Sequence, residues 1–573
     1  MAFVDLSVVQ DFSVVNLGSL ALLRPLLDKL NVAGIIDRHL PCNADISHGA
    51  ALDVLLAARL HSPTALVNVA QWASEHGVEY LWNVPADKLN DDRLARALDA
   101  FFEKRHAILA DITHEALRLT SLSLTRCHFD TTHLVLYGTY EDSRPRPPHA
   151  LDSLLSDIRM SPAHVTHGYL TKYKMLQLGL TSVVDDLGPL PVACHLFDGN
   201  RNGHTGIKEQ YHLLRNYLEL PEDFLLVSDR GTCSAEHLAT LLRHKHYAIC
   251  AAPWQDYGPL FEQHGERLLW KNASYLSREQ QRRRDTKSAL PLEEYRLAVL
   301  SHQLIDPATK KPFDCRVIFV HSSASAKEAK ERRDKNLAAI KAGLDKVARK
   351  LECAHPSTTP QSVTRQITRL LGKKSAAQHF RWQLVPLTAA ESAALPPPKK
   401  GYRQQTHRLE YSCDDAAALA ESKHDGIYAL VTTAPLTQNC DDLFSQYKRQ
   451  TYVERGHHEL KTPLAVTPIF LKTPRRIEAL ASLLFVALQA YMTIERLYRQ
   501  SVADDAKPQQ RRMTAEKILG KFRTCSLTVS ERSYGELVSV TGLSPEQKRI
   551  LNQLSLSTPA KILKQVLDPP PTS

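Results

Sequence analysis

The chain has 573 residues, several times the ~100–200 residues of an average domain, and is therefore expected to form two or more domains. Its 43% hydrophobic and 23% charged residues are typical of a soluble globular protein. Lys and Arg number 72 against 62 Asp and Glu, a net charge of +10, which favours a polyanionic partner. A basic enzyme without such a partner would have the same composition, so charge alone does not decide.

Cysteine usage and hydropathy exclude two further classes of protein. The ten cysteines are scattered from Cys42 to Cys525 without a Cys-x-x-Cys pair, so we expect reduced thiols, a cytoplasmic location and no structural zinc. The opening MAFVDLSVVQDF lacks the basic and apolar regions of a signal peptide. The most apolar stretch, Ile477–Ile494, is interrupted by Glu478, which predicts a buried amphipathic helix and no membrane partner.

Residues 1–124 are predicted to be helical. Segments 23–40 and 91–119 carry apolar residues three and four apart, and Asn90 or Asp91 would cap the second helix. From about residue 125 the period changes to two, and five short apolar runs indicate strands at 126–138, 175–186, 190–200, 224–231 and 247–253. Helices at 205–220 and 234–245 lie on either side of the fourth. This order predicts an α/β domain with a mixed sheet flanked by helices.

The pattern loosens from 255 to 424, and we expect a large insertion domain there, since it is too long for a loop. It contains a basic run with Arg282, Arg283 and Arg284, and a helix whose apolar seam runs from Leu337 to Leu351. A strand at 426–434 then resumes the first domain, followed by two helices at 440–462 and 474–500. The predicted units are 1–124, 125–254, 255–424, 425–500 and a helical C-terminal region at 501–573.

Two strands end in an aspartate, Asp130 in "HFDTT" and Asp229 in "LLVSDRG". Side chains leave the core at strand ends, so two such aspartates on neighbouring strands would face each other. For either residue alone, a turn or cap role is an equally good explanation. Two close carboxylates repel unless a cation lies between them, and Mg²⁺ or Mn²⁺ prefers carboxylate oxygen.

Phosphoryl transfer with two metals needs a third carboxylate, for which Glu454 and Glu459 are the candidates. At about 100° per residue on one helix, Tyr447, Gln450, Glu454 and Lys461 fall within an arc of roughly 60°, whereas Glu459 lies on another face. Such a face suits a phosphate beside a metal. Ordinary solvent exposure of helix residues is the alternative.

These residues resemble the DDE transposases of bacterial insertion sequences, in the branch with a Tyr-Arg-Glu-Lys signature. Tyr447, Glu454 and Lys461 match that signature, while Gln450 replaces its Arg. A rival register of Tyr452, Arg455 and Glu459 keeps the Arg but has Val466 in place of Lys. The blocks "FDTTHLVLYGTYED", "LLVSDRGTCS" and "HDGIYALVTT" also resemble the family, in its order. A departure is the short segment after His167.

The resemblance implies a ribonuclease H-like core in which Asp130, Asp229 and Glu454 hold two Mg²⁺ ions, with Mn²⁺ as a substitute. Asp130 would bridge both ions, and the other two carboxylates would hold one each. The implied activity is cleavage of double-stranded DNA at transposon ends and strand transfer into target DNA. Tyr447, Gln450, Lys461 and the arginines at 282–284 would contact DNA, and residues 1–124 would bind transposon ends.

The resemblance also implies a homodimer on DNA and a nucleoid-associated location in the cytoplasm. Two alternatives stay open: a ribonuclease H-like nuclease without strand transfer, and an inactive DNA-binding descendant. An unrelated hydrolase that uses two acids would work without divalent metal.

Overall fold

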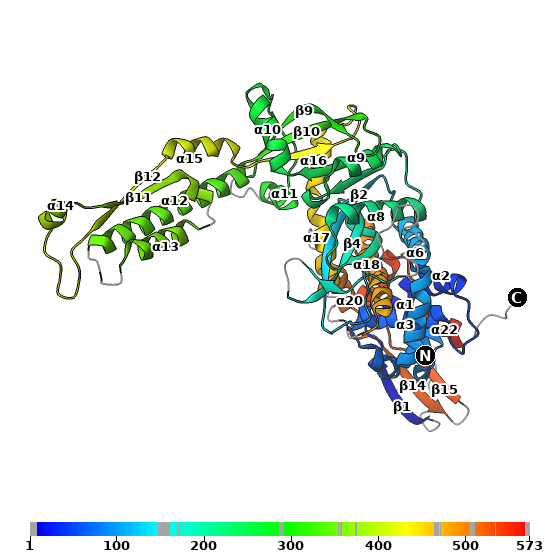
Figure 1. Ribbon diagram of the computed structural model, residues 1–573. Helices are drawn as coiled ribbons and strands as arrows, with labels where there is room; N and C mark the ends of the chain where they lie inside the picture. The colour runs from blue at the N-terminus through cyan, green and yellow to red at the C-terminus, as the bar shows by residue number, and fades with distance from the viewer. Residues whose placement is uncertain are drawn as a thin grey trace.

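The computed structural model describes residues 9–567 apart from 147–160, 169–171, 286–291, 353–354, 356–357, 373–374, 463, 465–468, 470, 503–509, 511 and 533–534. A compact body contains both ends of the described chain, and a long arm projects from it (Figure 1). The arm is formed by residues 323–421.

The N-terminal region is helical, as predicted. Its long helix begins where Asn90 caps it by accepting a hydrogen bond from the Arg93 N–H at 2.8 Å. The helices are α1 Leu20–Lys29, α2 Val32–His39, α3 His48–His61, α4 Val69–Glu75, α5 Val78–Trp82 and α6 Asp91–Thr120.

A ten-stranded mixed sheet forms the centre of the body, which confirms the predicted α/β class. Its order is β3-β4-β2-β6-β7-β13-β10-β9-β8, with β5 also paired to β4. β2, β6 and β7 are parallel to one another, and the other pairs are antiparallel. The strands are β2 Arg126–Leu136, β3 Thr166–His167, β4 Lys174–Asp185, β5 Gly188–Asp198, β6 Leu225–Ser228, β7 Tyr247–Ala252, β8 Lys271–Asn272, β9 Tyr295–Ile305, β10 Pro312–Ser322 and β13 Ile427–Thr432.

Helices of the central domain cover this sheet. They are α8 Gly203–Tyr217, α9 Ala235–Leu242, α10 Trp254–His264, α11 Arg278–Asp285, α16 Cys440–Lys448, α17 Thr451–Lys461 and α18 Pro474–Ser501. By length and composition α18 could cross a membrane, but its apolar stretch is entirely buried in the protein, which is typical of a core helix.

The segment 255–424 is in part an extension of the main sheet, since β8, β9 and β10 continue it beyond β13. Only the arm has a separate core, in which the seam on α12 packs against α13 and a two-stranded hairpin. The arm consists of α12 Ser323–Glu352, α13 Pro360–Leu371, β11 Phe380–Pro386, α14 Ala389–Ala394, β12 His407–Cys413 and α15 Asp415–Glu421.

The C-terminal region contains helices, as predicted, and also two strands that the sequence did not reveal. It contributes two strands to a three-stranded antiparallel sheet that is completed by β1 Val9–Asn16 from the other end of the chain. This pairing joins residues more than 500 positions apart, which no local pattern reveals. The elements are α20 Ala515–Gly520, β14 Ser526–Arg532, β15 Gly535–Val540, α21 Pro545–Gln553 and α22 Pro559–Leu567.

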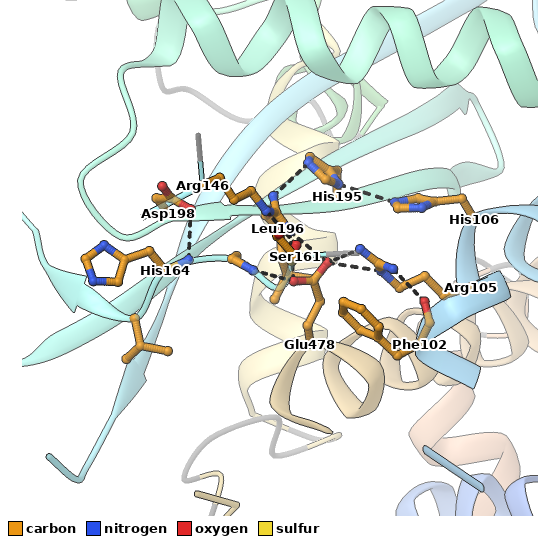
Figure 2. A network of polar contacts seen from close by, with 12 residues as sticks. Phe102, Arg105, His106, Arg146, Ser161, His164, His195, Leu196, Asp198 and Glu478 are labelled. Carbon is orange, nitrogen blue, oxygen red and sulfur yellow. Dashed lines mark hydrogen bonds and ion pairs between the residues drawn. The ribbon is translucent and has the colours of Figure 1, made fainter. Parts of the chain in front are cut away.

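A buried ionic network ties the N-terminal region to the half of the chain that forms the large sheet (Figure 2). Glu478 of α18, 1% exposed, accepts hydrogen bonds from Arg105 of α6 at 2.6 and 3.0 Å. Arg146 donates to the same carboxylate at 2.9 and 3.1 Å, and the Ala163 N–H donates at 2.7 Å. The glutamate that interrupts the apolar stretch is therefore a structural anion.

Candidate active site

The register of two parallel strands brings two aspartates together. Phe129 of β2 pairs with Ser228, the last residue of β6. The residue after each of these two is an aspartate: Asp130 follows Phe129, and Asp229 follows Ser228. Because neighbouring strands lie about 4.8 Å apart, both carboxylates stand at the level where β6 ends. Asp229 follows a strand end as predicted, but Asp130 lies within β2, which continues to Leu136.

Each aspartate also has a local role. Oδ1 of Asp229 accepts from the Arg230 N–H at 2.6 Å, and Oδ1 of Asp130 accepts from the Thr131 N–H at 2.7 Å. Such bonds fix the direction of a carboxylate. The cap role and the site role are therefore compatible.

Glu454 joins the two aspartates from the first turn of α17, which packs against β2. The pKa of Asp130 is raised to about 6, first by burial and then by the negative charges of Asp229 and Glu454. Charges influence one another this way only over short separations. The three carboxylates therefore share one neighbourhood, although they lie far apart in sequence.

The helix that carries Glu454 is broken, and the prediction of one helix from 440 to 462 is wrong. α16 ends at Lys448 and α17 begins at Thr451. Around the break, backbone N–H groups bond three residues back, Gln450 to Tyr447 and Val453 to Gln450, both at 3.0 Å. This tighter turn changes the helical phase, so an arc calculated for one regular helix does not extend across it.

Gln450 is turned toward the sheet, and its expected contact with DNA stays a prediction. Its Nε2 donates to the Phe129 carbonyl at 2.9 Å, and its Oε1 lies 3.1 Å from His128 Nδ1. Both partners directly precede Asp130 on β2. Gln450 therefore fastens the start of the Glu454 helix to the strand that carries Asp130.

Tyr447 lies near Asp229, whereas Lys461 lies near His133 and His457. Burial raises the pKa of Tyr447, and the charge of Asp229 raises it further, so this ring is close to Asp229. Lys461 is exposed at the end of α17, and its charge helps burial to lower the pKa of His133 on β2. Phosphate contact by Tyr447 and Lys461 stays a prediction.

The competing glutamate, Glu459, has a structural role. It is buried, and its carboxylate lies 3.4 Å from Arg455, which also bonds Glu495 of α18 at 2.5 Å. The rival register therefore describes the face of α17 that packs on α18. The face with Glu454 is the one turned toward β2.

The predicted arginines lie on α11, near the base of the arm. Arg283 pairs with Glu279 at 2.5 Å and Arg284 is exposed, while the side chain of Arg282 is outside the described part. The neighbouring Gln280 donates to the Glu293 carbonyl, and the Glu293 carboxylate accepts from Ser322, the residue before the arm. Their DNA contact stays a prediction, now placed at the base of the arm.

Two histidines of the site did not emerge from the sequence. Nδ1 of His457 lies 3.6 Å from Oδ2 of Asp130, and burial lowers the pKa of His457 to about 4. His128 is fully buried, with its pKa also lowered to about 4 by burial. Both rings are therefore neutral near pH 7. The i, i+3 spacing of Glu454 and His457 was the available signal.

Comparison with known families agrees with this geometry. Residues 150–489 match the family described as "Transposase DDE domain", and residues 12–113 match a "Domain of unknown function (DUF4277)". The chain belongs to the DDE transposase family. No curated protein matches it. The transposase match covers more than half of the chain and contains Asp229 and Glu454, but it begins 20 residues after Asp130.

The protein is therefore a transposase of the insertion-sequence type, its function is DNA transposition, and its mixed sheet is the predicted ribonuclease H-like fold. Such transposases generally depend on divalent metal. Among the described residues, no three His, Cys, Asp or Glu side chains form a closed metal-binding group. The donor set nevertheless suits a hard cation, because a partly buried carboxylate is repelled by two others and a cation would relieve that repulsion.

Proposed function

We propose that this transposase cuts DNA at the ends of its element and joins the freed 3′ ends to target DNA, with Asp130, Asp229 and Glu454 as catalytic carboxylates. The observation that carries this proposal is the effect of both other carboxylates on Asp130. Three such groups from a strand, a strand end and a helix suit two Mg²⁺ ions, with Mn²⁺ as a substitute. Of the three, Asp130 is the carboxylate that both others influence, and all three would hold the ions.

When bound, the ions would supply activation of the attacking water or 3′-hydroxyl and stabilisation of the leaving oxygen. The protein holds the carboxylates in position: backbone N–H groups orient Asp130 and Asp229, and Gln450 fixes the helix of Glu454 to β2. Neutral His457 beside Asp130 adds no positive charge that would compete with a cation. Lys461, exposed on the same side of α17, provides the charge for a substrate phosphate.

We also propose that residues 1–124 bind the ends of the element and that two copies act together on paired ends at the nucleoid. The basic run at 282–284 would contact the same DNA. The seam on α12 is not an interface between copies, because it is occupied by the core of the arm.

An assay with defined DNA tests the strand-transfer proposal. Purified protein, Mg²⁺, an oligonucleotide duplex carrying a pre-cleaved element end and a supercoiled plasmid should give joined product. Cleavage of intact ends without joining would instead support a nuclease, and activity that survives EDTA would exclude the metal-dependent mechanism.

A matched pair of variants tests the carboxylates. Asp229→Asn should abolish cleavage and joining but leave binding of end DNA intact. Asp223→Asn, the same change at an exposed residue in the loop before β6, should have no effect. If Asp229→Asn left every activity unchanged, the protein would be better described as a DNA-binding descendant without catalysis.

A further inference from the structure

The net charge of the protein is concentrated in one half of the arm. Residues 323–374 hold 13 Lys and Arg against five Asp and Glu, a net charge of +8. Residues 375–421, the other half of the arm, hold five of each and are neutral. The remaining 474 residues together account for only +2 of the total of +10. α12 carries nine Lys and Arg against five Asp and Glu, and α13 carries two Arg and no acidic residue, so both helices have an excess of cations.

Most of the described cations in this half lie on exposed sides of the two helices. On α12, the buried stripe of Ile340, Leu344, Val347 and Leu351 faces the core of the arm. At about 100° per residue, the exposed Lys335, Lys346 and Lys350 fall within an arc of roughly 60° that lies away from this stripe.

α13 presents the same kind of surface. It contains no acidic residue, and its exposed side carries Arg365 and Arg369 among Thr and Gln side chains. Arg, Thr and Gln are residues that commonly bind DNA phosphates. We call Lys335, Lys346, Lys350, Arg365 and Arg369 the basic face.

The basic face is not neutralised within the arm. In the described part of the chain, none of its five cations pairs with a carboxylate. Several acidic groups of the arm pair with other side chains: Glu391 and Glu410 pair with Arg408, and Glu421 pairs with His379. Cations without carboxylate partners on two neighbouring helices fit an extended polyanion.

The arm begins at the edge of the sheet where the carboxylates lie. The strand pairing places Asp229 level with Ile318 of β10, with β7 and β13 between them. Three strand spacings separate the two residues by about 14 Å. Ser322, where β10 ends, is four residues farther along the same edge direction, so the base of the arm lies about 20 Å from Asp229.

The two ends of the arm are held together at its base. The Ser322 N–H donates to the Gly426 carbonyl at 2.9 Å. Gly426 has φ 73°, and a Cβ there would lie 2.5 Å from the Ser322 carbonyl oxygen, so only glycine fits. From this base α12 extends about 45 Å, the length of roughly 13 base pairs.

We propose that the basic face of the arm binds the backbone of the target duplex. This inference rests on the proposed strand transfer and adds a partner surface to it. The side chains are suited to phosphates and not to reading bases, and the target is the duplex whose sequence the element does not fix. The arm lies at the opposite end of the sheet from the N-terminal region (Figure 1), so a duplex that crosses the site away from that region meets the arm.

Two four-residue variants with equal charge change test the proposal. The first replaces Lys346, Lys350, Arg365 and Arg369 by Ala. The control replaces Arg381, Lys399, Lys400 and Arg408 by Ala, four exposed cations from the neutral half of the arm. All eight side chains are exposed, and circular dichroism and thermal unfolding should show that both variants fold like the wild type.

The measurement is binding of a plasmid without element ends, as a function of salt, by protein already loaded with a pre-cleaved end. Each phosphate contact contributes about 0.9 to the slope of log K against log salt, so the first variant should lower the slope by up to about 3.6 and the control much less. Joining to the plasmid should fall with binding, while cleavage of intact ends should remain at the wild-type rate.

Equal slopes for the two variants would overturn the proposal, because bulk charge would then explain the binding. Loss of end cleavage in the first variant would also overturn it, because the arm would then hold the donor DNA. Plasmid binding is measured separately from joining of the pre-cleaved end to the plasmid. A wild-type protein that binds the plasmid but does not join the end to it would therefore count against strand transfer and not against the basic face.

Discussion

The buried carboxylate of Glu478 offers the sharpest test of how the body is held together. In the change Glu478→Gln the side chain keeps its size but loses its charge. Two buried guanidinium groups, those of Arg105 and Arg146, then have no anion between them (Figure 2). The five hydrogen bonds to the carboxylate come from four donor nitrogens, and at least two of these donors would face an NH₂ group in place of an oxygen.

Removal of one partner of a buried ion pair typically costs about 3–5 kcal/mol, because an uncompensated charge stays in the interior. All three side chains here are at most 7% exposed, so solvent screening reduces this figure little. We therefore expect Glu478→Gln to lower the free energy of unfolding by about 3–5 kcal/mol.

Urea denaturation followed by tryptophan fluorescence can measure this change, since Trp72 and Trp82 lie buried in the N-terminal region. The matched control is Glu103→Gln, which breaks the exposed pair of Glu103 and Arg475 between the same two helices. Exposed pairs contribute about 0–1 kcal/mol, so the control should be nearly neutral. If both variants lost less than about 1 kcal/mol, the view that Glu478 anchors α6 to α18 would be refuted.

Four further predictions concern the site and the N-terminal region. Gln450→Ala removes two hydrogen bonds worth about 1 kcal/mol each, so single-turnover cleavage should slow roughly 5- to 30-fold, and an unchanged rate would contradict its positioning role. Glu454→Gln should abolish cleavage, whereas Glu459→Gln should lower stability but leave the cleavage rate of the folded protein unchanged. Loss of cleavage in Glu459→Gln alone would favour the rival register. Lys461→Ala should reduce the slope of log K against log salt for binding of end DNA by about 0.9. An unchanged slope in salt titrations would exclude a phosphate contact by Lys461. Burial raises the pKa of Asp53 to about 6, so its contribution to stability becomes more favourable as the pH falls from 7 toward 4. In urea denaturation, the wild type should therefore gain stability relative to Asp53→Asn between pH 7 and pH 5, and an unchanged difference would contradict the shift.

The prediction of the central elements succeeded where the local signal was strong. The short apolar runs around Asp130 and Asp229 correspond to strands whose side chains are mostly buried. The strands β2, β4, β5, β6 and β7 all lie where such runs predicted them. The cap at Asn90 was also predicted correctly, because the capping side chain bonds a backbone N–H only three residues away. The strands of the C-terminal sheet were missed, since their partner β1 lies at the other end of the chain.

The amino-acid sequence by itself determined the local elements of this transposase, the three candidate carboxylates and the net positive charge. Only the tertiary structure decided which of these meet. The parallel register of β2 and β6 places Asp130 beside Asp229, and the break before α17 directs Glu454 toward them while Gln450 turns to the sheet. The folding of 323–421 into a separate arm gathers the net charge on one surface. Periodicity describes one element at a time, whereas register, helix phase and packing depend on contacts between segments that are distant in the sequence.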